Sequence, residues 1–269
     1  MTVFDDTHHE GFLARGYLRL GKVGGPEELA GLQRRIDDLM LGRIRYPNMR
    51  MQLFEAGTGK LRRTLGNEAA TLSYRRIDDL EQDPLFLAYM QQPFFQRICR
   101  RYVGEAVSVF RAMFMNKPAR WEQTLPWHQD VGAGWGIDRN PIVTVWTALD
   151  EATAANGAME IVPGSHVHGV INERHFLTPE EETRYAPPGK VEALEAEAGE
   201  AVLLHNLLLH RSGTNPTDRP RRAFSATYME AETRTLDTGM TFPVVFGPGA
   251  LDPATVCGKR AELVEKFYG

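Results

Sequence analysis

The chain has 269 residues, a formal net charge of −4 and two cysteines, Cys99 and Cys257. A chain of this length can bury a full core as one domain, and its small negative charge provides no positive field for nucleic acid. Two cysteines are too few for a disulfide framework or a cysteine-based zinc site. The N-terminus carries no basic and apolar leader, and no apolar run is long enough to span a membrane. We therefore expect a cytoplasmic protein that binds neither nucleic acid nor a membrane, while its oligomeric state is left open.

The first part of the chain has the pattern of a helical support. Residues 26 to 41 carry apolar side chains at helical spacing, with charged residues on the opposite face. A second helical pattern runs from Asp83 to Val103, within which Pro93 is expected to open a separate segment. Residues 43–73 and 172–190 show no regular pattern, so we expect both stretches to be loops over a site.

Short β-branched and aromatic runs follow, separated by Gly, Pro and Asn. They cover residues 107–115, 142–149, 158–162, 201–205 and 223–229. A series of this kind favours an all-β barrel or jelly roll. The sequence therefore predicts one mainly β domain over residues 1–269, with helical support to about residue 105, a β-barrel core over about 106–230 and a C-terminal extension over 231–269.

Residues 43–76 contain eight basic and two acidic side chains, although the chain as a whole is acidic. This local excess of positive charge favours an anionic substrate that binds near Arg62 and Arg63. A solvated basic face is the alternative interpretation.

The segment Trp127-His128-Gln129-Asp130 contains two metal-ligand side chains separated by one residue. On an extended strand, His128 and Asp130 project from the same side. An imidazole and a carboxylate are two ligands of the facial triad that leaves positions on non-haem Fe(II) open. His210, which follows the apolar run 201–204, is the best candidate for the third ligand. The His-x-Asp triplet by itself is weak evidence for a metal site, because a structural histidine and a surface aspartate can give the same sequence pattern.

The order and spacing of these residues and of Arg221, with their local sequence, resemble the phytanoyl-CoA dioxygenase (PhyH) family of Fe(II)/2-oxoglutarate oxygenases. The resemblance runs from about residue 76 to 228 and is densest around 115–130, 145–166 and 199–221. It implies a double-stranded β-helix of the cupin-like kind, with Fe(II) as cofactor and with 2-oxoglutarate and O₂ as co-substrates. It also implies His128, Asp130 and His210 as metal ligands and as catalytic residues. A carboxylate at position 130 favours hydroxylation, because related halogenating enzymes have a small residue there.

Arg221 follows His210 by eleven residues and matches the position that binds the far carboxylate of 2-oxoglutarate in this family. Strand alternation places Arg221 on the same face as Ala223 and Ser225, and Arg222 on the other face. A guanidinium binds a carboxylate through two parallel hydrogen bonds, which a lysine does not reproduce. A surface arginine in a basic cluster is the alternative. The resemblance places four more residues near the co-substrate or the metal, namely Ser212, Gln129, Trp146 and Arg76.

Trp127 and Trp135 flank the predicted ligand pair, and glycines on both sides of Trp135 predict a flexible loop. We expect this region to contact substrate. His175 has no partner pattern in the sequence.

The sequence thus predicts an oxygenase that hydroxylates an unactivated C–H bond of a small-molecule metabolite, with succinate and CO₂ as co-products. Desaturation, cyclisation or epimerisation at the same site is an open alternative. A non-catalytic barrel that holds a metal and binds a small ligand is a rival of another class. The sequence does not select a substrate, because one fold serves many substrates.

Overall fold

The computed structural model describes residues 4–55 and 60–256. Its α-helices are α1 (Asp6–Arg15), α2 (Pro26–Met40), α3 (Pro84–Met90), α4 (Pro93–Tyr102) and α5 (Pro179–Tyr185). Its strands are β1 (Tyr17–Lys22), β2 (Arg50–Glu55), β3 (Lys60–Leu65), β4 (Tyr74–Ile77), β5 (Val107–Lys117), β6 (Leu125–His128), β7 (Val143–Ala148), β8 (Met159–Ile161), β9 (Glu192–Leu194), β10 (Glu200–His205), β11 (His210–Ser212), β12 (Arg221–Glu230) and β13 (Val244–Phe246).

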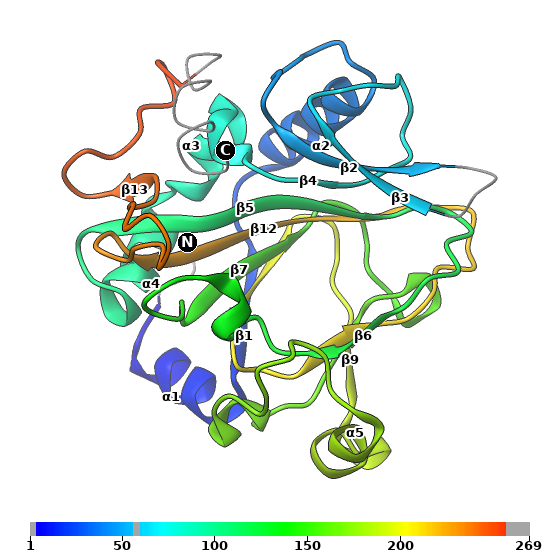
Figure 1. Ribbon diagram of the computed structural model, residues 1–269, viewed down its shortest axis with the longest axis vertical. Helices are drawn as coiled ribbons and strands as arrows, with labels where there is room; N and C mark the ends of the chain where they lie inside the picture. The colour runs from blue at the N-terminus through cyan, green and yellow to red at the C-terminus, as the bar shows by residue number, and fades with distance from the viewer. Residues whose placement is uncertain (1–3, 56–59, 257–269) are drawn as a thin grey trace.

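Two antiparallel sheets form the body of the protein (Figure 1). The larger sheet has the order β1-β10-β7-β12-β5-β4-β2-β3, and β13 pairs with β5. The smaller sheet has the order β6-β11-β8-β9. Strands of both sheets line one internal cavity, so the two sheets face each other across it. This arrangement is the double-stranded β-helix that the resemblance implies.

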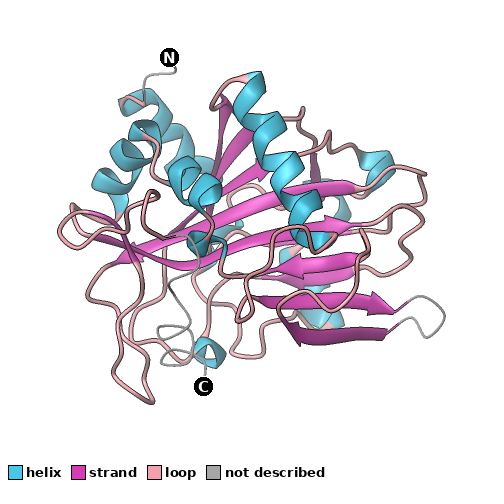
Figure 2. Ribbon diagram, turned by 90° about the horizontal axis from the view of Figure 1, so that it is seen from above, coloured by secondary structure: helices cyan, strands magenta, loops and turns pink. Residues whose placement is uncertain are grey.

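Helices cover the outer face of the larger sheet (Figure 2). Helix α2 buries Leu32, Ile36 and Leu39, which join one apolar core with Phe114 of β5 and Phe224 of β12. Proline stands in the first turn of α2, α3 and α4, where the backbone N–H that it lacks has no helical partner. The predicted helix over 26–41 and the predicted break at residue 93 are confirmed.

Strand β12 shows how alternation separates this core from the cavity. Phe224 and Tyr228 belong to the core beneath the helices, whereas Arg221 and Ser225 line the cavity on the other side. β12 pairs with β5 along its length and with β7 over residues 223–228. A strand paired on both sides is a rigid support for the side chains that it carries.

The N-terminal third, expected to be helical support to about residue 105, contains strands as well as helices. Strands β1 to β4 lie in that third and belong to the larger sheet. The stretch 43–73, expected to be a loop, contains the antiparallel pair β2 and β3. Strand β3 is at the sheet edge, and four of its six side chains are polar or charged, as is common on edges because charge discourages pairing with another chain. That composition hid the strand in the sequence.

The other two boundary predictions also need correction. Residues 172–190 include helix α5, which begins at a capping box formed by Thr178 and Glu181. The segment after residue 230 is not a separate extension throughout, because β13 adds to the larger sheet. Cys99 is buried in α4, while Cys257 lies outside the described residues.

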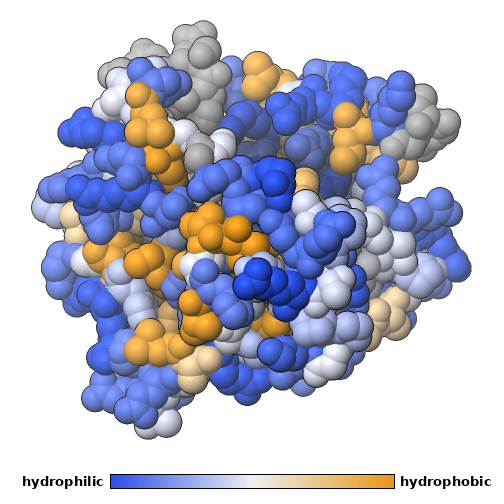
Figure 3. Space-filling model, turned by 60° about the horizontal axis from the view of Figure 1, so that its bottom comes forward, coloured by the Kyte–Doolittle hydropathy of each residue, from blue (hydrophilic) through white to orange (hydrophobic). Residues whose placement is uncertain are grey.

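The face presented in Figure 3 is mainly hydrophilic, with separate hydrophobic patches. Single exposed apolar side chains are normal on protein surfaces. In the part of the chain that the structure describes, no helix combines the length and the apolar character needed to cross a membrane.

Candidate active site

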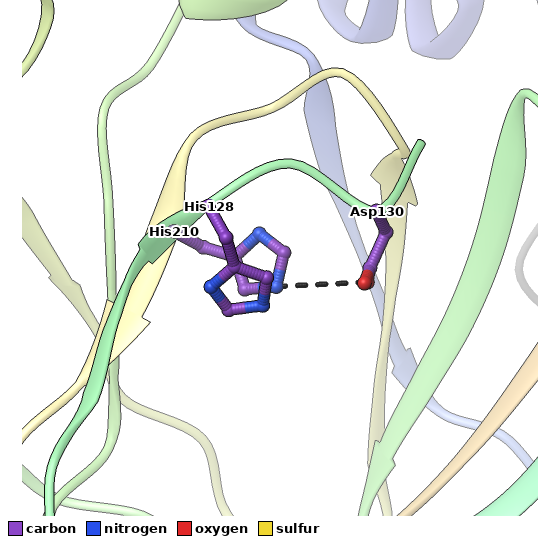
Figure 4. A group of neighbouring side chains, drawn as sticks. All are labelled: His128, Asp130 and His210. Carbon is purple, nitrogen blue, oxygen red and sulfur yellow. Dashed lines mark ion pairs between the residues drawn. The ribbon is translucent and has the colours of Figure 1, made fainter. Parts of the chain in front are cut away.

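The three predicted ligands lie together at one edge of the smaller sheet. The Cα atoms of His128 on β6 and His210 on β11 are partners in the antiparallel pair, and their ring centroids are 4.1 Å apart. Asp130 follows β6, and its Oδ2 is 3.6 Å from Nε2 of His210. One ligand atom of each residue lies within 4.8 Å of the other two (Figure 4). Residues far apart in the sequence therefore form one group of donors.

The protonation of this group suits a metal ion. Nδ1 of His128 donates to the carbonyl oxygen of Pro126 at 2.8 Å, and Nδ1 of His210 donates to that of Leu208 at 3.0 Å. Because a carbonyl only accepts, each Nε2 of a neutral ring keeps its lone pair, as in metal-binding histidines. Burial and the neighbouring His210 lower the pKa of His128 to about 3, so the ring is neutral near pH 7. Two neutral imidazoles and a carboxylate fit Fe(II) with open positions.

Burial alone would raise the pKa of Asp130, but the nearby His210, His128 and Arg111 outweigh it, so the pKa is lowered. Asp130 is therefore an anion at neutral pH. Its backbone N–H donates to the carbonyl of Asn206 at 2.8 Å, which ties the end of β6 to the loop before β11. These contacts fix the position of the carboxylate relative to the two histidines.

His175 is a fourth histidine at this site, and sequence reasoning missed it. Its ring centroid is 4.9 Å from that of His128, and its backbone φ of 76° is in the left-handed region. Phe176 forms an isolated antiparallel β-bridge with His128, and the N–H of Leu177 donates to the carbonyl of Trp127 at 2.9 Å. This loop therefore lies along β6 and closes one side of the cavity. No ligand spacing in the sequence marks His175.

The triad opens into a cavity of about 260 Å³ between the two sheets. Much of its wall is apolar, made by Met113, Met115, Leu125, Met159, Leu204 and Phe176. Arg221 lies at the opposite end of β12 from the core-facing Tyr228 and lines the same cavity. The cavity thus combines a metal-ligand group, an apolar wall and a basic end.

Arg221 is 5% exposed, and its guanidinium lacks an acidic partner among the described residues. One Nη donates to the carbonyl of Gly157 at 2.8 Å, while the buried Nε has no hydrogen-bond partner. Burial and the neighbouring Arg75 lower the pKa of Arg221 to about 10, which leaves it charged at neutral pH. A buried, charged guanidinium whose Nε has no acceptor is the feature expected where an anionic ligand binds.

Arg222 projects to the other side of the sheet, as alternation predicts. Its guanidinium bonds Asp150 at 2.6 Å and Asp37 of α2 at 2.7 Å. The two adjacent arginines therefore have different partners, and Arg221 alone of the pair faces the cavity.

Two further cations lie beside Arg221 and were not predicted. A register shift in the β2–β4 pairing makes Arg75 the extra residue of a β-bulge, so Arg75 and Arg76 both line the cavity. Lys117 donates to the carbonyl of Gly213 and, with Arg75 and Arg221, lines an adjoining cavity of about 250 Å³. Burial, Arg221 and Arg75 lower the pKa of Lys117 to about 7.

The residues predicted near the co-substrate have mixed positions. Ser212 and Trp146 line the cavity. Arg76 also lines it, but its guanidinium bonds Asp78 at 2.5 and 2.8 Å. The prediction that Gln129 lies near the co-substrate needs correction, because Gln129 is not among the cavity-lining residues. Its side-chain amide is hydrogen-bonded to the backbone of Gly169, Leu207 and Ile171. It ties three loop segments together.

The residues predicted to contact substrate need more correction. Trp127 is 2% exposed and packs in a separate apolar cluster behind β6, since neighbouring residues on a strand face opposite sides. Trp135 is absent from the cavity lining and stacks on Phe110 at 4.9 Å. Arg62 forms surface ion pairs with Glu55 and Glu68.

Arg63, in contrast, lines an outer cavity of about 610 Å³ that shares Arg76 and Arg111 with the inner one. Part of the basic excess over 43–76 is neutralised by acids outside that stretch: Arg43 pairs with Asp38, Arg50 with Asp79 and Arg76 with Asp78. A count of charges along the sequence therefore overstated the free positive charge.

The sequence profile of the phytanoyl-CoA dioxygenase (PhyH) family matches residues 12–223. A probable phytanoyl-CoA dioxygenase of Caenorhabditis elegans is 27% identical over 227 residues, which are 79% of this chain and 71% of the relative. The peroxisomal phytanoyl-CoA dioxygenase of Mus musculus is 24% identical over 208 residues, which are 72% of this chain and 57% of the mouse protein. The chain therefore spans little more than half of the mammalian relative.

Among solved structures, EctD from S. alaskensis with bound Fe superimposes with a TM-score of 0.68 at 21% identity, covering 86% of this chain and 79% of EctD. The carbocyclase SnoK from nogalamycin biosynthesis has a TM-score of 0.63 at 17% identity, covering 86% of each chain. At these identities the likeness establishes the shared fold.

Fold, donor group and family profile together define a non-haem iron oxygenase that depends on 2-oxoglutarate and O₂. A non-catalytic binding barrel is thereby set aside. The chain belongs to the phytanoyl-CoA dioxygenase family.

Proposed function

We propose that His128, Asp130 and His210 hold Fe(II), that Arg221 holds 2-oxoglutarate, and that the enzyme hydroxylates an unactivated C–H bond of a small-molecule metabolite. Succinate and CO₂ are the co-products. The observation that carries this proposal is the buried guanidinium of Arg221, which has no acidic partner in the described part of the chain and lines the same cavity as the three donors.

Arg221 binds the far carboxylate of 2-oxoglutarate through its guanidinium fork, since its Nε and the remaining Nη hydrogens are available. Arg75 and Lys117 add positive charge at this end, and the hydroxyl of Ser212 lies in the same wall. Arg75 is a better match than Arg76 for the basic position expected near the co-substrate, because Arg76 is already neutralised by Asp78. Arg75 has no ion pair among the described residues.

Bound Fe(II) supplies O₂ activation coupled to the oxidative decarboxylation of 2-oxoglutarate. The protein's own contribution is position and the exclusion of water. The backbone carbonyls that bind Nδ1 of His128 and His210 fix the orientation of both rings. The methionine and leucine side chains of the wall present apolar surface to the cavity, which limits the access of water to a reactive centre.

The test is a substrate panel with the Fe(II) enzyme, 2-oxoglutarate and ¹⁸O₂. Succinate formation is measured, and the masses of the products are determined by mass spectrometry. The panel includes phytanoyl-CoA, for which the curated relatives are named. The proposal predicts that one compound stimulates succinate formation and gains one ¹⁸O atom. A product that loses two hydrogens, closes a ring or inverts a centre without gaining oxygen would replace hydroxylation with the corresponding alternative. Absence of O₂-dependent succinate formation with every compound would contradict the proposal.

A further inference from the structure

Arg111 is a further cation of the cavity wall, well away from the co-substrate end. On the paired strands β5 and β12, Lys117 is the partner of Arg221 and Arg111 is the partner of Thr227. Six residues along a strand correspond to roughly 20 Å. Arg111 therefore belongs to a different part of the cavity from Arg221, on the side where the Asp130 carboxylate contributes to its electrostatic surroundings.

Regular alternation along β5 directs Arg111 into the cavity, on the same face as Met113 and Met115. The register of β5 and β12 shifts between Thr227 and Tyr228, which leaves Phe110 as an extra residue. Phe110 stacks on Trp135 with 4.9 Å between ring centroids, and the guanidinium carbon of Arg111 lies 4.2 Å from the Trp135 centroid and 4.8 Å from that of Phe110. The two rings hold the guanidinium in place through cation–π contact. The loop that carries Trp135 therefore positions Arg111.

Arg111 has no ion pair with an acidic side chain anywhere in residues 4–55 and 60–256, and no hydrogen bond to its guanidinium is found there. Burial lowers its pKa, and so does the charge of Arg76, although Arg111 stays protonated at neutral pH. Of the nearby acids, Asp78 bonds Arg76 and Asp130 belongs to the metal-ligand group. Arg50, another neighbour, is bonded to Asp79. A largely buried cation is thus left with its donors facing a cavity.

The place of Arg111 is the junction of two spaces. It lines both the inner cavity that contains the triad and the outer cavity of about 610 Å³ that Arg63 and Gln52 also line. A molecule that reached the metal ligands from the outer cavity would pass this guanidinium. Any anionic group that it carries would meet Arg111 before the reacting carbon reaches the metal.

We propose that Arg111 is a specificity-determining residue that binds a carboxylate of the substrate, so that the substrate is a small organic acid whose reacting carbon lies over the metal site. The inference rests on the proposed function and names its substrate class. A guanidinium fork matches the two oxygens of a carboxylate. A phosphate dianion fits less well, because Asp130 and Asp78 lie close to the same cation and repel a second negative charge.

The experiment uses the Fe(II)–2-oxoglutarate enzyme without oxygen and follows the visible charge-transfer band of the chelate. The probes are acid and amide pairs of one skeleton, hexanoate with hexanamide and benzoate with benzamide, together with hexylphosphonate. Binding beside the metal shifts the band. We expect each acid to bind about 30-fold or more tighter than its amide, the size typical of a lost charged partner. Hexylphosphonate is expected to bind more weakly than hexanoate.

The Arg111→Gln variant should reduce the acid preference to less than about threefold, and Arg111→Lys should restore part of it. The matched control is Arg211→Gln. Arg211 lines the same cavity, but its guanidinium is paired with Glu160 and lies 4.9 Å from the Trp127 ring centroid, so the acid preference should persist.

Equal binding of acids and amides by the wild type, or an acid preference that survives in Arg111→Gln, would overturn the proposal. Bleaching of the band by an acid would also count against it, because displacement of 2-oxoglutarate signals binding at Arg221. Stronger binding of hexylphosphonate would replace a carboxylate with a phosphoryl group. If the wild type forms no band, the proposed function fails. The acid preference is then measured by tryptophan fluorescence, since Trp135 contacts Arg111.

Discussion

Replacing Arg221 with alanine should remove most of the affinity for 2-oxoglutarate. The guanidinium is 5% exposed and has one neutral hydrogen-bond partner, so a bound carboxylate would form a largely desolvated pair with it. Loss of one member of such a pair costs about 2 to 5 kcal/mol. Arg75 and Lys117 remain nearby and offset part of the loss, so we expect about 2 to 3 kcal/mol, or roughly 30- to 150-fold in Kd.

The assay is an anaerobic titration of the Fe(II) protein with 2-oxoglutarate, followed by the visible charge-transfer band. The matched control is Arg222→Ala. It removes the bonds to Asp150 and Asp37 on the opposite side of the sheet, so it should lower thermal stability and change the Kd less than about threefold. Equal affinity of the wild type and Arg221→Ala would refute the reasoning. Loss of affinity in Arg222→Ala alone would show that the two arginines have exchanged roles.

Three other outcomes follow from the same geometry. Asp130→Ala or His210→Ala should abolish turnover and weaken Fe(II) binding while circular dichroism stays unchanged, and full activity in either variant would remove that residue from the metal site. An anionic ligand binds better when Lys117, whose pKa is lowered to about 7, is charged. Affinity for 2-oxoglutarate should therefore fall as pH rises above 7, by at most about tenfold per pH unit. The Lys117→Met variant should show a flatter dependence of this affinity on pH. Arg63→Gln should raise KM and reduce its dependence on salt, whereas the surface-paired Arg62→Gln should leave both unchanged, and equal effects of the two would return the pair to a solvated basic face.

The metal-ligand group was accessible from the sequence because it depends on regular geometry. His128 and Asp130 share a side of one extended segment, and His210, which follows the apolar run 201–204, could be named as the third ligand. Arg221 was accessible for the same reason, since it lies on a long strand with regular alternation.

The same rule excludes Trp127 and Gln129 from the cavity, because each is next in sequence to a residue that faces it. Their proximity to the ligands along the chain was misleading. Alternation was the stronger criterion, and it predicts the packing of Trp127 behind β6.

Arg75 could not be found in this way, because it depends on a β-bulge. The bulge adds one residue to β4 and brings Arg75 and Arg76 to the cavity side, and no glycine or proline marks the position. His175 depends on a left-handed backbone position in a loop that only the tertiary fold places beside His128. Local pattern does not contain this information.

The most direct test of the account is a crystal structure of the Fe(II) protein with 2-oxoglutarate, grown without oxygen and with anomalous data on both sides of the iron edge. The account predicts one iron peak bonded by His128, Asp130 and His210, with the far carboxylate of 2-oxoglutarate on Arg221. An iron peak away from any of the three side chains, or a far carboxylate held by Arg111, would contradict it.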